Sequence, residues 1–177
     1  MPSKAPKRLA LVNSFESEAE TAALLALAAG KAVLEIGTFE GYSAALMATV
    51  AKRVETVDWH QGGHELGERN TLMTAWRNLR DAPNVVMHVG KSAAVLPGLR
   101  GPFDLVFIDG SHQYADVRLD IIHARRLSKQ LLFHDYNYGF IGVMRAVNEL
   151  CAETGYGLRP VAGSLVLVDL ARDIMRP

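Results

Sequence analysis

Residues 33–43 read VLEIGTFEGYS, and the rest of the chain is organised around this stretch. Its apolar residues Val33, Leu34 and Ile36 predict a buried strand, the glycine that follows predicts a turn, and the small residues after Tyr42 predict a helix. Such a succession places free backbone N–H groups at the carboxyl edge of a sheet, where open α/β sheets bind nucleotides. The alternative is an ordinary strand-to-helix turn that binds no ligand.

The glycines of this turn differ from those of a pyrophosphate-binding turn. The chain has Glu35-x-Gly37-x-x-x-Gly41 where a dinucleotide fold has Gly-x-Gly-x-x-Gly. We expect Gly37 to let a ligand approach the main chain and Gly41 to let the helix cross close to the strand. The Glu35 carboxylate would repel a pyrophosphate but would suit a cationic ligand. S-adenosylmethionine is such a ligand, because it carries an ammonium and a sulfonium but no phosphate.

Composition limits the classes of partner. The chain has 177 residues, 49% of them hydrophobic, and its formal net charge is +0. This length predicts a single domain, over residues 16–177. The basic, proline-containing start of the chain predicts a loose N-terminal tail over residues 1–15. The balanced charge gives no general attraction to nucleic acid or membrane. The single cysteine, Cys151, excludes an internal disulfide, and no signal peptide or membrane-length apolar run is visible, so we expect a cytoplasmic protein.

Helical and strand patterns alternate along the chain. Helices are predicted at 17–29, 42–51, 71–80, 115–128 and 140–154, and strands at 32–36, 54–57, 85–89, 103–109, 130–133, 157–161 and 165–170. The short link between the last two strands makes them antiparallel neighbours. The predicted fold class is therefore α/β, a doubly wound, mostly parallel sheet with a C-terminal antiparallel hairpin.

Polar residues follow several of the predicted strands. Asp58 ends the second strand, where a carboxylate can accept the two ribose hydroxyls of a nucleotide. Asp109 and His112 follow the fourth strand, and His134 and Asp135 follow the fifth. Together these four side chains could hold a divalent ion, or one histidine could act as a general base. A pair of hydrogen-bonded acids without a metal is an equally good interpretation.

The sequence Gly90-Lys91-Ser92 follows the third strand. A phosphate-binding loop would need a second glycine five positions before Gly90, and that position holds Val85. We therefore expect Ser92 to cap the next helix and this strand end to face the adenine of a bound nucleotide.

The segment from about residue 31 to residue 170 resembles the class I S-adenosylmethionine-dependent methyltransferases. Residues 33–43 resemble the first motif of the catechol O-methyltransferase-like branch. The stretches FDLVFIDGSH (103–112) and LLFHDY (131–136) are similar to small bacterial methyltransferases related to the macrolide sugar O-methyltransferases. Four motifs occur in the expected order, so the resemblance implies a Rossmann-like methyltransferase fold with S-adenosylmethionine as cofactor.

The resemblance also implies roles for individual residues. The cofactor would be bound by Glu35, Gly37, Thr38, Gly41, Ser43, Asp58, Trp59, Lys91, Ser92 and Asp109. Asp109, His134 and Asp135 fall on the ligands of Mg²⁺ or another divalent metal in these relatives. His134 is a departure, since the relatives commonly have an acid there and Mg²⁺ prefers oxygen. His112 and His134 are then the candidate catalytic bases.

The implied reaction is direct displacement of the methyl group by a hydroxyl of a small-molecule acceptor. Few residues precede the first strand, and the link at 136–139 is short, so the chain has little material to wall an acceptor pocket. A second copy of the chain completing the site is our hypothesis. Two alternatives remain, a non-catalytic cofactor-binding or scaffold protein of the same fold and, less favoured by the turn at residues 35–41, an NAD-dependent oxidoreductase.

Overall fold

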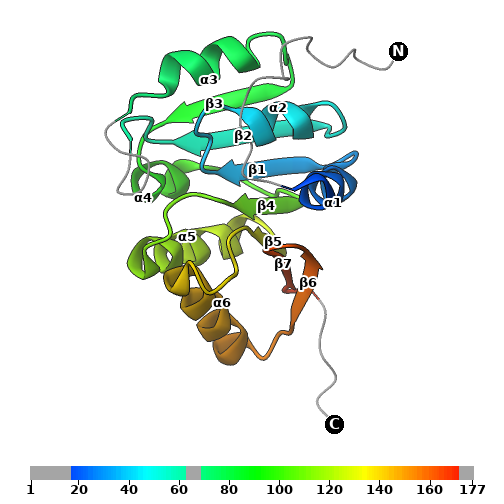
Figure 1. Cartoon of the computed structure of the whole chain (residues 1–177), viewed down its shortest axis with the longest axis vertical. Helices are drawn as coiled ribbons and strands as arrows, with labels where there is room; N and C mark the ends of the chain where they lie inside the picture. The colour runs from blue at the N-terminus through cyan, green and yellow to red at the C-terminus, as the bar shows by residue number, and fades with distance from the viewer. Residues whose placement is uncertain (1–16, 63–68, 172–177) are drawn as a thin grey trace.

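A seven-stranded sheet forms the centre of the structure, a computed structural model that describes residues 17–62 and 69–171 (Figure 1). The predicted tail over residues 1–15 lies outside the described residues. The strands are β1 Ala32–Ile36, β2 Arg53–Asp58, β3 Val85–Val89, β4 Leu105–Ile108, β5 Gln130–Phe133, β6 Leu158–Ala162 and β7 Leu165–Asp169. Three of them, β1, β3 and β5, have the bounds that the sequence predicted.

Helices flank the sheet on both faces. They are α1 Glu18–Ala28, α2 Tyr42–Ala48, α3 Leu72–Leu79, α4 Ser92–Val95, α5 Tyr114–Leu127 and α6 Ile141–Thr154, with a 3₁₀ turn η2 at Leu96–Gly98. Helix α2 ends three residues before its predicted end, because the Thr49 N–H and the Thr49 hydroxyl both donate hydrogen bonds to the Leu46 carbonyl. The expectation that Ser92 caps α4 is wrong, since Lys91 is the N-cap and Ser92 is the first helical residue.

The strand order is β3-β2-β1-β4-β5-β7-β6. Strands β1 to β5 pair in parallel, while β7 runs antiparallel to both β5 and β6. The predicted doubly wound, mostly parallel sheet with a C-terminal antiparallel hairpin is therefore confirmed. Strand β7 lies between β5 and β6. Because β7 runs antiparallel to β5, the turn that joins β6 to β7 lies at the carboxyl edge of the parallel strands.

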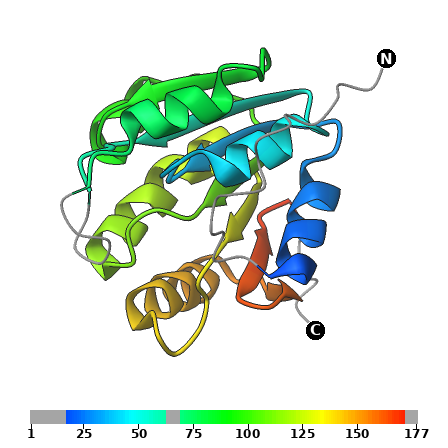
Figure 2. The ribbon, with the colours of Figure 1, turned by 45° about the horizontal axis from the view of Figure 1, so that its top comes forward.

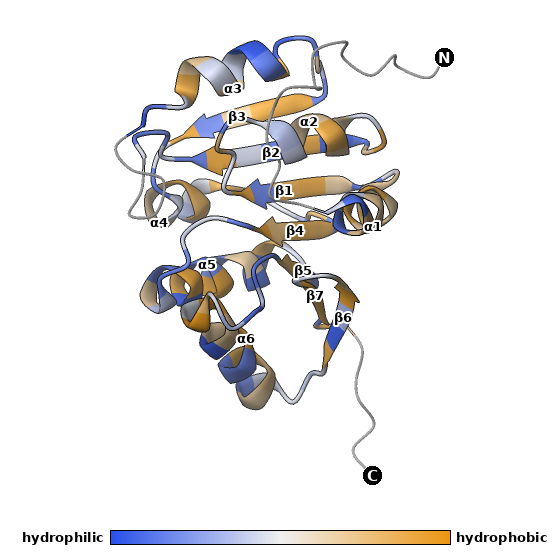
Figure 3. Cartoon of the chain, viewed as in Figure 1, coloured by the Kyte–Doolittle hydropathy of each residue, from blue (hydrophilic) through white to orange (hydrophobic). Residues whose placement is uncertain are grey.

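Apolar side chains are buried on both faces of the sheet. Much of the sheet, β4 for example, is accordingly orange, the colour of hydrophobic residues, in Figure 3. Leu34 and Ile36 of β1 pack with α5 and α6, whereas Val33 of the same strand packs with α1 and α2. Burial on both faces explains why the parallel strands are almost continuously apolar in sequence. Within residues 17–62 and 69–171, no helix is long and apolar enough to span a membrane.

Candidate functional site

Three non-glycine residues with left-handed backbone angles lie at the carboxyl edge of the sheet. Phe39 follows β1 with φ 48°, His60 follows β2 with φ 58° and Asp135 follows β5 with φ 59°. Such angles are unfavourable for residues with a Cβ and persist where surrounding contacts hold them, frequently at functional sites. This edge is also where the sequence places the candidate cofactor and metal residues.

A buried hydrogen-bond network lies beneath the turn after β1. Glu35 is 0% exposed and accepts hydrogen bonds from the Ser43 and Thr56 hydroxyls, each at 2.5 Å. The Thr38 hydroxyl, also buried, is 2.5 Å from the Thr56 hydroxyl. The sequence assigns Glu35, Thr38 and Ser43 to the cofactor, and in the structure their side chains are buried. They lie under the turn and fix its shape.

The two glycines of the turn make room for protein rather than for a ligand. Gly37 has φ +104°, and a Cβ there would lie 2.0 Å from the Asp109 carbonyl oxygen. Gly37 thus lets the end of β1 lie against the end of β4. Gly41 has φ +85°, and a Cβ there would lie 3.0 Å from the Leu79 side chain of α3, so the expected close approach to a strand is instead an approach to a helix.

Asp58 is held rigidly at the end of β2. Its Oδ2 accepts the Phe39 N–H at 2.7 Å, and its Oδ1 accepts the His60 N–H at 2.6 Å. Both donors belong to residues with left-handed backbone angles, so the two turns and the carboxylate fix one another. A carboxylate oxygen accepts more than one hydrogen bond, which leaves capacity for two ribose hydroxyls.

Trp59 and Lys91 lie together at the neighbouring ends of β2 and β3. The indole is 42% exposed, and the Lys91 Nζ lies 5.0 Å from its ring centroid, a cation–π distance. This pair could form one wall of an adenine site. Ser92 differs from its prediction, because its hydroxyl hydrogen-bonds the buried carboxyl of Asp120 on α5 rather than facing the pair.

The structure brings the predicted acids and histidines after β4 and β5 into one cluster. The His134 Nδ1 lies 3.1 Å from Asp135 Oδ2 and 3.3 Å from Asp109 Oδ1. On the other side of the Asp135 carboxylate, the His112 Nε2 lies 2.8 Å from the same Oδ2. The four residues predicted to be catalytic or metal-binding, Asp109, His112, His134 and Asp135, are therefore neighbours, although more than twenty positions separate His112 from His134.

Charge pairing sets the protonation of the cluster. Burial alone would lower the pKa of His134, but the two carboxylates close to its Nδ1, those of Asp109 and Asp135, outweigh burial and raise this pKa to about 11. Burial raises the pKa of Asp109, against the pull of His134. A histidine that keeps its proton at neutral pH is a poor general base. His112 is therefore the better candidate for that role.

The cluster also has the composition of a cation site. The ligand atoms of Asp109, His134 and Asp135 all lie within 4.8 Å of one another. Both ring nitrogens of His134 are buried without a well-formed hydrogen bond to any described residue. Two carboxylates and an imidazole suit Mn²⁺, Fe²⁺ or Zn²⁺, whereas Mg²⁺ favours an all-oxygen set. The residues fit a borderline divalent ion better than Mg²⁺.

Glu20 of α1 also belongs to this site, and sequence reasoning missed it. Its Oε1 lies 3.7 Å from the His134 Nε2, on the side of the ring opposite Asp109 and Asp135. In the sequence Glu20 is one of several acids at a helix start, and its spacing from Ser17 indicates only a capping box. Its long-range partners appear only once the sheet is assembled.

A hollow of about 360 Å³ adjoins the cluster. Its lining comes from the loop after β4 and the start of α6, namely His112, Gln113, Tyr114, Gly139, Phe140, Ile141, Gly142 and Arg145. The His112 ring packs on the Phe140 ring with centroids 4.0 Å apart, which connects the hollow to the cluster. Among the lining residues Ile141 is 58% exposed, and Tyr138, which precedes Gly139 in the chain, is 86% exposed, so uncovered apolar side chains belong to this segment.

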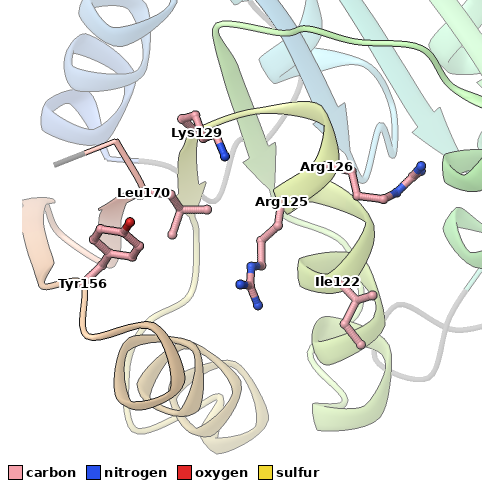
Figure 4. A pocket seen from close by; sticks show the side chains of 6 residues that line it. All are labelled: Ile122, Arg125, Arg126, Lys129, Tyr156 and Leu170. Carbon is pink, nitrogen blue, oxygen red and sulfur yellow. The ribbon is translucent and has the colours of Figure 1, made fainter. Parts of the chain in front are cut away.

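A second hollow, of about 390 Å³, lies at the opposite edge of the sheet (Figure 4). It is lined by Ile122, Arg125, Arg126, Lys129, Tyr156 and Leu170. Lys129 precedes β5 and Leu170 follows the reversed β7, which places this hollow away from the strand ends described above. Basic residues at the end of α5 also complement the negative end of the helix dipole, so they need no ligand to explain them.

The chain resembles known methyltransferases in sequence and in fold. The methyltransferase domain family matches residues 34–136. The protein-L-isoaspartate O-methyltransferase of Rhizobium meliloti (strain 1021) is 36% identical over 86 residues, which are 48% of this chain but 38% of that protein. The chain thus spans well under half the length of this curated relative.

Solved structures share the fold over most of the chain. Cofactor-bound Rv0187 from MTB has a TM-score of 0.73 and 22% identity, covering 93% of this chain and 85% of that one. An O-methyltransferase from Bacillus cereus in complex with SAH has a TM-score of 0.66 and 20% identity, covering 90% and 84%. From its matched motifs and its fold, the chain belongs to the methyltransferase domain family, within the class I S-adenosylmethionine-dependent methyltransferases that its sequence resembles.

Proposed function

We propose that this protein transfers the methyl group of S-adenosylmethionine to a hydroxyl group of a small acceptor molecule. One observation carries the proposal. A rigid nucleotide-type site around Asp58 and an acid–histidine cluster with its own hollow lie at the same edge of the sheet. The Bacillus cereus neighbour of the same fold is described in complex with SAH, which supports S-adenosylmethionine as the cofactor.

The cofactor would lie across the carboxyl ends of β1, β2 and β4. Asp58 would accept the ribose hydroxyls, while Trp59 and Lys91 would flank the adenine. The backbone of the turn at residues 37–41 would face the methionine part, and Asp109 would lie beside it. This arrangement differs from the sequence prediction in using the backbone of the turn and not its buried side chains.

The acceptor would occupy the hollow beside His112 and Phe140. Its hydroxyl oxygen would attack the methyl carbon in line with the carbon–sulfur bond, and the bonding pair would return to sulfur to give S-adenosylhomocysteine. His112 would take the hydroxyl proton, and the Asp135 carboxylate at 2.8 Å would stabilise the resulting imidazolium. Holding the two reactants in line supplies most of the acceleration, because the sulfonium is already a good leaving group.

A divalent metal is a further part of the proposal. A bound ion would lower the pKa of the acceptor hydroxyl and help to orient it. Asp109, His134 and Asp135 would hold it, and their nitrogen-containing ligand set favours Mn²⁺, Fe²⁺ or Zn²⁺ over Mg²⁺. Calorimetric titration with each ion compares these affinities directly.

Calorimetric titration with S-adenosylmethionine, S-adenosylhomocysteine and NAD tests the cofactor. We expect the two sulfur compounds to bind and NAD not to bind. A methyl-transfer assay with a catechol and an isoaspartyl peptide then tests turnover. Cofactor binding without turnover on any acceptor would favour the non-catalytic alternative, and absence of cofactor binding would contradict the proposal.

A further inference from the structure

Glu20 uses its two carboxylate oxygens for different purposes. Oε2 accepts hydrogen bonds from the Ser17 N–H at 2.8 Å and the Ser17 hydroxyl at 2.9 Å, which completes a capping box at the start of α1. Oε1 points away from the helix and accepts the Ser164 N–H at 2.7 Å and the Ser164 hydroxyl at 2.9 Å. A capping box needs only the first set of contacts, so the second set requires another explanation.

The turn between β6 and β7 is built around this carboxylate. Figure 2 shows α1 beside these two strands. Gly163 has φ +51°, and a Cβ at this position would lie 2.4 Å from Glu20 Oε1. The glycine therefore leaves the space that the carboxylate fills, and Glu20 is only 6% exposed as a result.

From this buried position Glu20 reaches the cluster in two ways. Its Oε1 faces the Nε2 of His134 at 3.7 Å. Through Ser164 it also reaches Asp135, because the Ser164 hydroxyl accepts the Asp135 N–H at 3.3 Å. The Ser164 carbonyl accepts the next N–H, that of Tyr136, at 3.1 Å. These bonds hold the strand end at the residue whose backbone angle is left-handed.

We propose that Glu20 is a positioning residue for methyl transfer. It holds the His134 ring with Nε2 toward α1 and Nδ1 toward Asp109 and Asp135, and through Ser164 it holds the Asp135 backbone in its unfavourable conformation. A carboxylate on each side of the ring fixes its orientation more firmly than either could alone. This inference rests on the proposed function, because it assigns the purpose of the arrangement to that reaction.

The test compares Glu20→Gln with Ser17→Ala in the full chain. Glu20→Gln keeps the shape of the side chain but removes the charge beside His134. Ser17→Ala removes the hydroxyl that donates to Oε2 and accepts the Glu20 N–H, and it leaves the contacts of Oε1 in place. We measure the ring-nitrogen NMR shifts of His134, the affinity for S-adenosylhomocysteine, and kcat with an active acceptor.

For Glu20→Gln we expect changed His134 ring shifts and a kcat lowered about tenfold or more, with cofactor affinity changed less than twofold. Ser17→Ala should leave the His134 shifts and kcat as in the wild type. If Glu20→Gln does not fold, Ser164→Ala replaces it, because it keeps the charge but loosens the carboxylate and the Asp135 N–H. Unchanged ring shifts and kcat in the folded variant would overturn the inference.

Failure of the inference is distinguishable from failure of the proposed function. If the wild-type protein does not bind S-adenosylhomocysteine, the proposed function is wrong, yet the His134 ring shifts still report whether Glu20 orients the ring. If the wild type binds S-adenosylhomocysteine and methylates an acceptor, while Glu20→Gln and Ser17→Ala give the same ring shifts and kcat, only the role of Glu20 is wrong.

Discussion

At the residue scale, Asp58 is the side chain on which cofactor affinity should depend most directly. Replacing Asp58 by Ala removes two ribose acceptors and also the anchor of the Phe39 and His60 N–H groups. We expect S-adenosylmethionine affinity to fall at least about tenfold, which corresponds to about 1.4 kcal/mol or more for hydrogen bonds to a charged group. Calorimetry measures this loss. Asp81→Ala, an exposed acid distant from the strand ends, is the control, and equal affinities in the two variants would contradict the assignment.

Asp120 of α5 should make stability depend on pH. Burial raises the pKa of its carboxyl from 3.8 to about 6, and the Ser92 hydrogen bond only partly opposes this effect. The folded protein therefore keeps this proton between pH 4 and 6, where the unfolded chain loses it, so the contribution of Asp120 to stability falls as pH rises through this window.

Asp120→Asn should therefore be about 1 to 3 kcal/mol more stable than the wild type at pH 7.5, and about equal to it near pH 4. The amide cannot lose a proton, so it avoids the cost of a buried charge. Urea unfolding at both pH values measures the difference between the two proteins. A difference that is the same at both pH values would show that burial of the Asp120 charge is not its origin.

Residue chemistry was only partly predictable from sequence. Asp58, Asp109, His112, His134 and Asp135 could be placed because they lie at strand ends or in the loops that follow them, and strand ends meet at one edge of a parallel sheet. The burial of Glu35 beneath its turn was not predictable, because alternation along a strand does not tell which buried partners a carboxylate will find. Glu20 was missed, since its partner Ser164 is 144 positions away.

At the scale of elements, the approach of α6 to the loop after β4 should control the site. Gly142, the second residue of α6, permits this approach, because a Cβ there would lie 2.3 Å from the His112 carbonyl oxygen and 2.8 Å from the Tyr114 nitrogen. Both neighbours are backbone atoms, so a substitution must push the helix away. That movement would also separate Phe140 from the His112 ring.

Gly142→Ala should therefore destabilise the protein by about 1 to 3 kcal/mol and reduce turnover, through overpacking against backbone. Gly98→Ala in η2 is a matched control, because a Cβ there meets nothing within 4 Å. Thermal unfolding and the methyl-transfer assay measure both variants. Equal melting temperatures and rates for the two would contradict this packing argument.

The elements themselves were largely predictable. Strands β1, β3 and β5 carry short apolar runs bounded by turn residues, and their bounds match the prediction. The end of α2 and the cap of α4 were not predictable, since both depend on which hydroxyl or carbonyl lies within reach after folding. Helix-end chemistry is decided by contacts that the pattern of apolar residues does not report.

At the scale of the whole molecule, the hollow beside His112 is the part that a second copy of the chain could complete. Ile141, which lines the hollow, is 58% exposed, and Tyr138, which lies in the same segment, is 86% exposed. We expect a dimer in light scattering, and we expect Tyr138→Ser with Ile141→Ser to shift it toward monomer. The paired substitution should raise the KM for the acceptor severalfold and leave cofactor affinity unchanged. A wild-type monomer with full activity would contradict this expectation.

The reversed strand β7 has a consequence for how the protein is made. The turn at residues 163–164 is translated long after α1, yet it supplies the partner of Glu20 and the clamp on Asp135. Synthesis proceeds from the N-terminus, and contacts between distant segments form last. The nascent chain can therefore assemble its cofactor-side strands while the acid–histidine cluster is still unformed. A ribosome-bound chain arrested before residue 163 should therefore bind S-adenosylmethionine but show little methyl transfer.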